Sequence, residues 1–206
     1  MPRQTTHLLF ALSALLLAAG PLAARGQKSL TAPGKYKDWN DDIDRVEIVQ
    51  TFKLADYARV VVEPLDGSGV ELPDKDDNTY GPVKAALQHA TGPYALGIAA
   101  ELGDRIEVVE ADQGGGGEGK FLILRGTIET LDPGSQAARY WVGFGAGAAK
   151  TGIEGELFDA ETGKVLVRFT QERRSGVGDF GGDYEELFDR NLRQIGGDIG
   201  TLLGAF

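Results

Sequence analysis

Histidine, carboxylates and glycine-rich turns are the features of this sequence whose types and spacing could support chemistry. His7 lies in an apolar leader, so His89 is the one histidine in the rest of the chain. It stands beside Ala90 in a helical stretch, and the sequence contains no Gly-x-Ser-x-Gly nucleophile motif. We therefore expect neither a serine triad nor a histidine-based zinc site.

Residues 74–78 (Asp-Lys-Asp-Asp-Asn) resemble the start of a calcium-binding loop. Asp74, Asp76 and Asn78 would supply its first three oxygen ligands. The EF-hand pattern then fails, because Thr79 occupies the glycine position and Ala85 occupies the position of the closing glutamate. The segment is interpreted as a solvated loop before a helix, and a looser calcium site is the alternative.

Gly143, Gly145 and Ala148 formally match a dinucleotide-binding glycine pattern. That pattern requires a helix after the glycines, whereas residues 150–156 alternate as a strand does. A P-loop is excluded as well, since Ala149 precedes Lys150 where glycine is required. We expect a close-packed bend here, and no nucleotide or other cofactor.

A catalytic pair of carboxylates leaves no local signature, because its two members come from distant positions. A carboxylate-based hydrolase acting on envelope polysaccharide is therefore an open alternative for this chain. It predicts a deep cleft in which two or more Asp or Glu side chains converge with displaced pKa values.

The first 26 residues are typical of a cleavable signal peptide. Arg3 gives a positive start, residues 8–19 form an apolar run, and Gly20 with Pro21 ends it. This run is shorter than the roughly 20 apolar residues that cross a membrane. We expect cleavage after Ala24 or Gly26, export to the periplasm or beyond, and no transmembrane span in the mature chain.

The composition excludes several classes of function. The chain has no cysteine, which rules out disulfides, thiolate nucleophiles and a lipid-bearing cysteine. Its formal charge of −10 repels phosphate backbones, so a nucleic-acid partner is not expected. What remains after the leader is long enough to bury the core of one domain.

Residues 27–52 are polar and predict an arm or linker, with short strand pairing around residues 46–52. Residues 53–206 predict one globular domain. Apolar periodicity and turn residues predict strands over 57–63, 105–110 and 121–131, a hairpin over 153–170, a kinked or divided helix over 80–102, and a helix over 184–203. This order predicts an α+β fold, with helices packed on one face of a mixed, largely antiparallel sheet.

Three glycines of the last predicted helix, Gly196, Gly200 and Gly204, are spaced by four residues and line one helix face. Glycine costs roughly 1 kcal/mol relative to alanine inside a helix, so three in register require a steric reason. Close packing within the chain and docking of a partner are the two alternatives.

A second candidate partner-binding segment contains Arg139, Tyr140, Trp141 and Phe144. Arg, Tyr and Trp are the residue types richest in binding hot spots. The alternative places Tyr140 and Trp141 in the core, as is common for tryptophan. No metal ligand or catalytic residue is predicted with either candidate set.

Three segments resemble a family of exported bacterial proteins, the domain of unknown function 4410. They are residues 134–147 (Gly-Ser-Gln-Ala-Ala-Arg-Tyr-Trp-Val-Gly-Phe-Gly-Ala-Gly), 156–166 (Glu-Leu-Phe-Asp-Ala-Glu-Thr-Gly-Lys-Val-Leu) and 173–182 (Arg-Arg-Ser-Gly-Val-Gly-Asp-Phe-Gly-Gly). The resemblance implies a small α/β module of the cell envelope, similar to the curli secretion lipoprotein, and it brings no catalytic residues. Gly92 to Tyr94 departs from the unbroken first helix that the family implies.

Together, the leader, the lack of catalytic motifs and the two candidate partner-binding sets favour an exported, non-enzymatic interaction module. Its partner would be an envelope protein or a second copy of the same chain. The missing cysteine favours a state without a lipid anchor, unlike the lipoproteins of the family.

Overall fold

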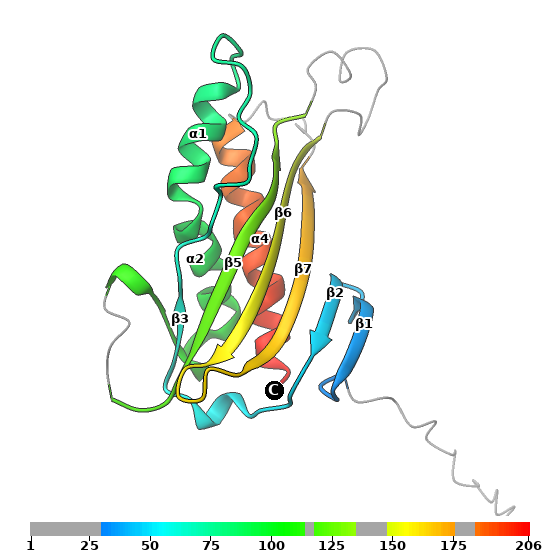
Figure 1. The fold of residues 1–206 in the computed structure, drawn as a ribbon, viewed down its shortest axis with the longest axis vertical. Helices are drawn as coiled ribbons and strands as arrows, with labels where there is room; N and C mark the ends of the chain where they lie inside the picture. The colour runs from blue at the N-terminus through cyan, green and yellow to red at the C-terminus, as the bar shows by residue number, and fades with distance from the viewer. Residues whose placement is uncertain (1–29, 114–117, 135–147, 176–183) are drawn as a thin grey trace, which may run out of the picture.

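The computed structural model describes residues 30–113, 118–134, 148–175 and 184–206. They form one seven-stranded sheet, with helices packed behind it in the view of Figure 1. The strands are β1 (Gly34–Trp39), β2 (Ile43–Ile48), β3 (Arg59–Val62), β4 (Glu107–Glu110), β5 (Phe121–Asp132), β6 (Ala149–Asp159) and β7 (Val165–Ser175). The α-helices of the described part are α1 (Tyr80–His89), α2 (Thr91–Leu102) and α4 (Tyr184–Gly204).

The strand order across the sheet is β1-β2-β7-β6-β5-β3-β4. Pairing is antiparallel from β1 through β5, whereas β3 runs parallel to both β5 and β4. Helices α1 and α2 connect β3 to β4, because parallel neighbours need a crossover rather than a tight turn. The predicted α+β class, with a mixed and largely antiparallel sheet, is confirmed.

The core lies between the sheet and the helices. Helix α4 directs its apolar stripe at the sheet, and the buried members of this stripe are Phe188, Leu192, Ile195, Ile199 and Leu202. Strands β6 and β7 contact this helix, and along β5 every second side chain, such as Leu122 and Leu124, is buried in the same core. Among the described residues, no helix combines the length and the apolar character needed to cross a membrane.

Residues 34–48 correct the expectation of a polar arm. They form the hairpin of β1 and β2, which joins the sheet where β2 pairs with β7. Asn40 and Asp41 make the turn with positive φ, a conformation that these residue types tolerate. Only one face of the hairpin is covered, so few of its side chains are buried, and charged residues separate them in the sequence. The buried side chains are Trp39, Ile43, Val46 and Ile48.

The predicted division of the first helix is confirmed, although the junction lies at Ala90 rather than at Gly92 and Pro93. Pro93 stands in the first turn of α2, where a backbone N–H has no partner within the helix. The proline therefore sits near the start of the second helix and does not break it.

Helices α2 and α4 approach each other through glycine. A Cβ atom at Gly196 would collide with the carbonyl oxygen of Tyr94 and lie 3.1 Å from the Cα of Gly97. A Cβ atom at Gly97 would in turn collide with the carbonyl oxygen of Arg193. The two backbones are thus in direct contact, which only a residue without a side chain permits.

The Tyr94 hydroxyl is the feature of α2 that this packing leaves unsatisfied. Tyr94 is fully buried, and its hydroxyl has no hydrogen-bond partner among the described residues. Burial raises the pKa of this phenol, since the charged form would lose its hydration. A buried polar atom without a partner costs about 1–3 kcal/mol.

Replacing Tyr94 with phenylalanine should therefore leave the free energy of unfolding unchanged or raise it. The ring stays in place and only the unsatisfied hydroxyl is removed. Urea unfolding of the two proteins checks this expectation. A loss of more than about 1 kcal/mol would show that the hydroxyl has a partner in the folded protein.

A buried amide ties the hairpin to the rest of the fold. Gln171 of β7 donates from Nε2 to the Asp42 carbonyl at 2.8 Å and to the Asp198 carboxylate at 2.6 Å. Its Oε1 accepts the backbone N–H of Asp44 at 3.0 Å. Arg173 also donates to Asp198 from Nε, at 2.8 Å. The turn of the hairpin, strand β7 and helix α4 therefore meet at one hydrogen-bonded group.

Candidate interaction surface

Charged side chains form an ordered row across the sheet face opposite the helices, one from each of five strands and the last from Glu63, which directly follows β3. The strand register pairs each member with the next from β1 through β5, and the β3–β5 pairing, which ends at Val62 and Leu124, places Glu63 beside Arg125. We call this set the charge row; in order across the sheet it is Lys35, Glu47, Arg168, Glu156, Arg125 and Glu63.

The charges alternate in sign along the entire row, and neighbouring members form ion pairs. Arg125 Nε donates to Glu63 at 2.6 Å, and Arg168 Nε donates to Glu156 at 2.6 Å. Glu47 lies 3.5 Å from both Lys35 and Arg168. Hydrogen bonds to their glutamates raise the pKa of both arginines, which keeps these cations charged.

The charge row contributes little to the stability of the fold. Its side chains are exposed or half-exposed, from 82% at Lys35 to 33% at Glu63, and ion pairs at the surface contribute about 0–1 kcal/mol each. What distinguishes the row is its order, because three cations and three anions alternate without interruption from β1 to the residue after β3.

A row of apolar side chains borders the charge row on the same face. Ile123 and Phe158 are paired in the β5–β6 register, and Phe158 is paired with Val165. The Arg125 guanidinium lies 4.8 Å from the centroid of the Phe158 ring, a cation–π contact. Val49 follows at the end of β2 and is 43% exposed. We call Val49, Val165, Phe158 and Ile123 the apolar row.

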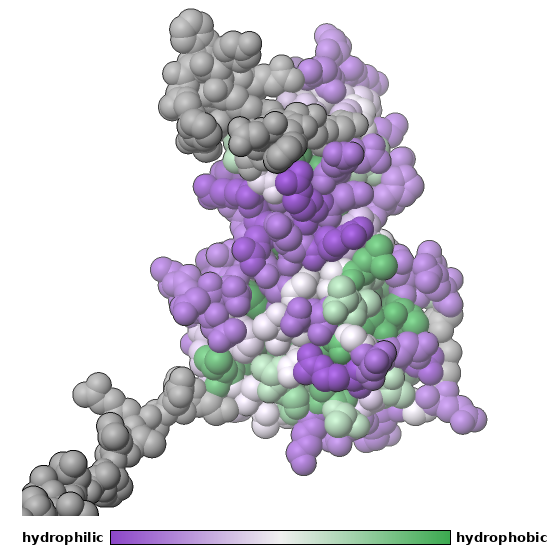
Figure 2. All heavy atoms as spheres, turned by 180° about the vertical axis from the view of Figure 1, so that it is seen from behind, coloured by the Kyte–Doolittle hydropathy of each residue, from purple (hydrophilic) through white to green (hydrophobic). Residues whose placement is uncertain are grey.

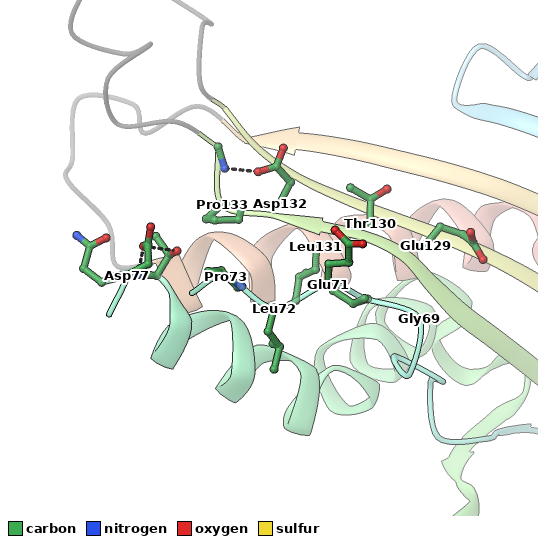
Figure 3. A pocket seen from close by; sticks show the side chains of 14 residues that line it. Gly69, Glu71, Leu72, Pro73, Asp77, Glu129, Thr130, Leu131, Asp132 and Pro133 are labelled. Atoms are coloured by element: carbon green, nitrogen blue, oxygen red, sulfur yellow. Dashed lines mark hydrogen bonds between the residues drawn. The ribbon is translucent and has the colours of Figure 1, made fainter. Parts of the chain in front are cut away.

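A wide cavity of about 860 Å³ lies beside the C-terminal end of β5. Its lining provides a test of the hydrolase alternative. Its acidic lining residues are Glu71, Asp77, Glu129 and Asp132. Figure 3 shows these carboxylates spread along the cavity rather than converging on one point. Asp132 accepts the backbone N–H of Gly134 at 2.7 Å. The described lining thus lacks the convergent pair that a glycosidase requires.

The displaced carboxyl pKa values on this side of the molecule do not suit a general acid. Hydrogen bonds from the hydroxyl and the backbone N–H of Thr79 lower the pKa of Asp77. The backbone N–H of Ser68 likewise lowers the pKa of Asp66. A general acid needs a raised pKa to hold its proton near neutral pH, so these shifts have the opposite direction.

Within the described residues, the other chemical motifs found in the sequence are not accompanied by an assembled set of catalytic or metal-binding side chains. His89 ends α1 and lines a cavity of about 600 Å³ with Glu110, Asp189 and Thr91, whose hydroxyl oxygen accepts the backbone N–H of Leu65 at 3.0 Å. In the calcium-like loop, Asp77, which is not one of the three predicted ligands, accepts hydrogen bonds from Thr79. Across the described ranges, no three His, Asp or Glu side chains are grouped to hold a metal ion.

The predicted partner-binding residues divide into two groups. Arg139, Tyr140, Trp141 and Phe144 lie outside the described residues, as do the glycine pattern at 143–145 and the leader. The three helix glycines are described, and each faces its own chain. Gly196 and Gly200 contact α2, and Gly204 lies against the side chain of Arg105. The alternative of packing within the chain accounts for them.

The side of the molecule formed by the helices also carries exposed apolar surface. In Figure 2, apolar surface gathers in one part of this side and is bordered by polar residues. Leu96 of α2 is its most exposed large apolar side chain, at 57%. The open sheet face combines apolar side chains with the ordered charge row, so it is the stronger candidate for a specific surface.

A family model matches the central part of the chain. The model of a domain of unknown function, DUF4410, aligns with residues 61–178. The chain belongs to this family. The match includes β3 through β7 and the helices α1 and α2, whereas the hairpin of β1 and β2 and helix α4 lie outside it. The resemblance inferred from residues 134–182 is thereby confirmed.

Solved structures with a similar arrangement of elements are distant in sequence. The PelC dodecamer from Paraburkholderia phytofirmans is 16% identical with a TM-score of 0.46, covering 74% of this chain and 96% of that one. Protein XCC0632 from Xanthomonas campestris, of family DUF330, is 12% identical with a TM-score of 0.41, covering 72% of this chain and 85% of that one. No curated protein matches the chain.

Sequence reasoning missed the charge row because its members are scattered along the chain and their spacing forms no local pattern. The available signal was alternation within each strand, such as Glu154 and Glu156 between buried neighbours in β6. Only the strand order and the register show that one charge from each strand falls on a common line.

Proposed function

We propose that the protein is an exported, non-enzymatic interaction module of the bacterial cell envelope, which docks a partner through the open face of its sheet. The observation that carries this proposal is the charge row, an ordered set of alternating charges beside an apolar row on a face that no described helix covers. Ordered charges set the specificity and the register of a docking partner more than they set its affinity.

Export is supported by the leader at the start of the sequence, with its positive n-region, short apolar run and small residues before residue 27. N-terminal sequencing of the protein from a periplasmic fraction tests this point. We expect a chain that begins at Arg25 or Gln27. A cytoplasmic chain that still carries Met1 would contradict export.

Docking through the open face is tested by photo-crosslinking in cells. The photo-reactive residue p-benzoylphenylalanine replaces Glu154, which is exposed on this face, and in a matched control replaces Lys84, which is exposed on α1. We expect a discrete adduct from position 154 and none from position 84. Absence of an adduct at 154, or equal adducts at both positions, would overturn the docking role.

The hydrolase alternative gains no support from a specific observation in the described residues. The carboxylates of the cavity are spread out, and the pKa values of Asp66 and Asp77 are lowered rather than raised. The segment at 139–144 stays a candidate second contact, since its residue types favour binding.

A further inference from the structure

We infer that the occupant of the open sheet face is a second copy of the same chain, joined through the charge row about a two-fold axis parallel to the strands. This inference rests on the proposed docking role of the open face. It is based on the order of charges in the charge row. When the row is read in the reverse direction, every position carries the opposite sign.

The argument follows from the order of the six charges. From β1 to β3 the signs are plus, minus, plus, minus, plus, minus, and their reverse order has the opposite sign at every position. A two-fold axis that lies between the two sheets and runs along the strands reverses the row of the second copy. Each cation then faces an anion of the other copy.

The centre of the row fixes where this axis passes. Arg168 and Glu156 are the middle members, so the axis lies between β7 and β6. Arg168 then faces Glu156 of the second copy, Glu47 faces Arg125, and Lys35 faces Glu63. Every contact occurs twice, as an isologous interface requires.

The apolar row obeys the same axis. Val165 of β7 and Phe158 of β6 flank the axis and exchange partners across it. Val49 at the end of β2 falls opposite Ile123 of β5 in the second copy. The axis therefore places apolar side chains opposite apolar ones while it places opposite charges together, and one operation satisfies both rows.

The overall charge of the protein makes this surface exceptional. The chain carries a formal charge of −10, so two copies repel each other over most of their surface. The charge row has three cations and three anions and is neutral as a unit. Two copies that meet along this row bring no excess of negative charge together within the row itself.

The test is a charge exchange between two variants of the exported protein, followed by sedimentation equilibrium over a concentration series. Arg125→Glu and Glu47→Arg each place like charges opposite each other twice in a homodimer. We expect self-association of each variant alone to weaken by about tenfold or more. In an equimolar mixture, both contacts pair opposite charges again, so a heterodimer should form with affinity near that of the unmodified protein.

Recovery in the mixture cannot come from repair of the ion pairs within a chain, because each variant keeps its own mismatch. Lys84→Glu and Glu118→Arg make the same changes of net charge on exposed residues away from the row, and they should associate as the unmodified protein does. Lys35→Glu with Glu63→Arg gives a second exchange at the ends of the row, for use if Arg125→Glu fails to fold.

Outcomes that overturn the inference are distinct from those that overturn the docking role. An unmodified protein that stays monomeric at every concentration, or a variant mixture that stays as weak as its components, excludes the second copy as occupant. If the crosslinker at position 154 then captures a different envelope protein, the docking role stands and this inference falls. If it captures nothing, both fall.

Discussion

A single methyl group added at Gly196 should destabilise the protein by about 3 kcal/mol, because overpacked sites cost this much when the neighbours cannot move. The added carbon of Gly196→Ala would meet the backbone of α2 at Tyr94 and Gly97. A flexible side chain could rotate away, but a helix backbone can only shift as a unit. The helices would have to separate, which would loosen the core under both.

The neighbouring residue supplies the control. Gly197 belongs to the same helix, and nothing lies within 4 Å of the position that its Cβ would occupy. Gly197→Ala should raise stability by up to about 1 kcal/mol through helix propensity alone. Urea unfolding of both variants gives the comparison. Equal stability of the two would show that α2 and α4 do not touch at Gly196 in solution.

Replacing the buried Gln171 with methionine should cost about 1–3 kcal/mol, because it removes three hydrogen bonds that join the hairpin turn and Asp198 to β7. Methionine matches the length and shape of glutamine, so packing is retained while three hydrogen bonds are lost. The Asp44 N–H and the Asp42 carbonyl both lose their side-chain partner. We expect faster amide hydrogen exchange throughout β1 and β2, with β5 and β6 less affected.

Thr170→Val is the matched control for this prediction. Thr170 precedes Gln171 in β7, so its side chain lies on the opposite face of the sheet. This variant should change stability by less than about 0.5 kcal/mol and leave hairpin exchange unchanged. Uniform acceleration across all strands in Gln171→Met would instead mean that the amide supports the whole fold rather than the hairpin.

The elements that could be predicted from the sequence are those with strong local periodicity. The alternation in residues 121–131 and the turn at Gly163, whose φ is +67°, are both found as expected. The first helix pair was predicted from Gly92 and Pro93, but its junction lies earlier, because proline is compatible with a first turn. The ends of the observed helices and strands differ from the predicted ends by a few residues, because helix ends and turns are specified less strongly than the periodic segments between them.

The hairpin of β1 and β2 could not be predicted with the same ease. Trp39 and Ile43 are buried in the common core, and β7, the strand that pairs with β2, lies far along the chain. A half-covered hairpin rich in Lys and Asp has the composition of an exposed arm. The helix glycines show the same limit, since their spacing required a close neighbour but did not identify α2.

Because β2 pairs with β7, the sheet can be completed only after most of the chain has been synthesised. A hairpin closes locally in about 1–10 μs, so β1 and β2 can pair soon after they are made. An isolated two-stranded hairpin is only marginally stable, and the strand that holds it, β7, ends at Ser175. For most of its synthesis the hairpin therefore lacks the strand that anchors it, and Trp39 is uncovered. A protein that binds the unfolded chain at this hairpin must release it before β7 can complete the sheet.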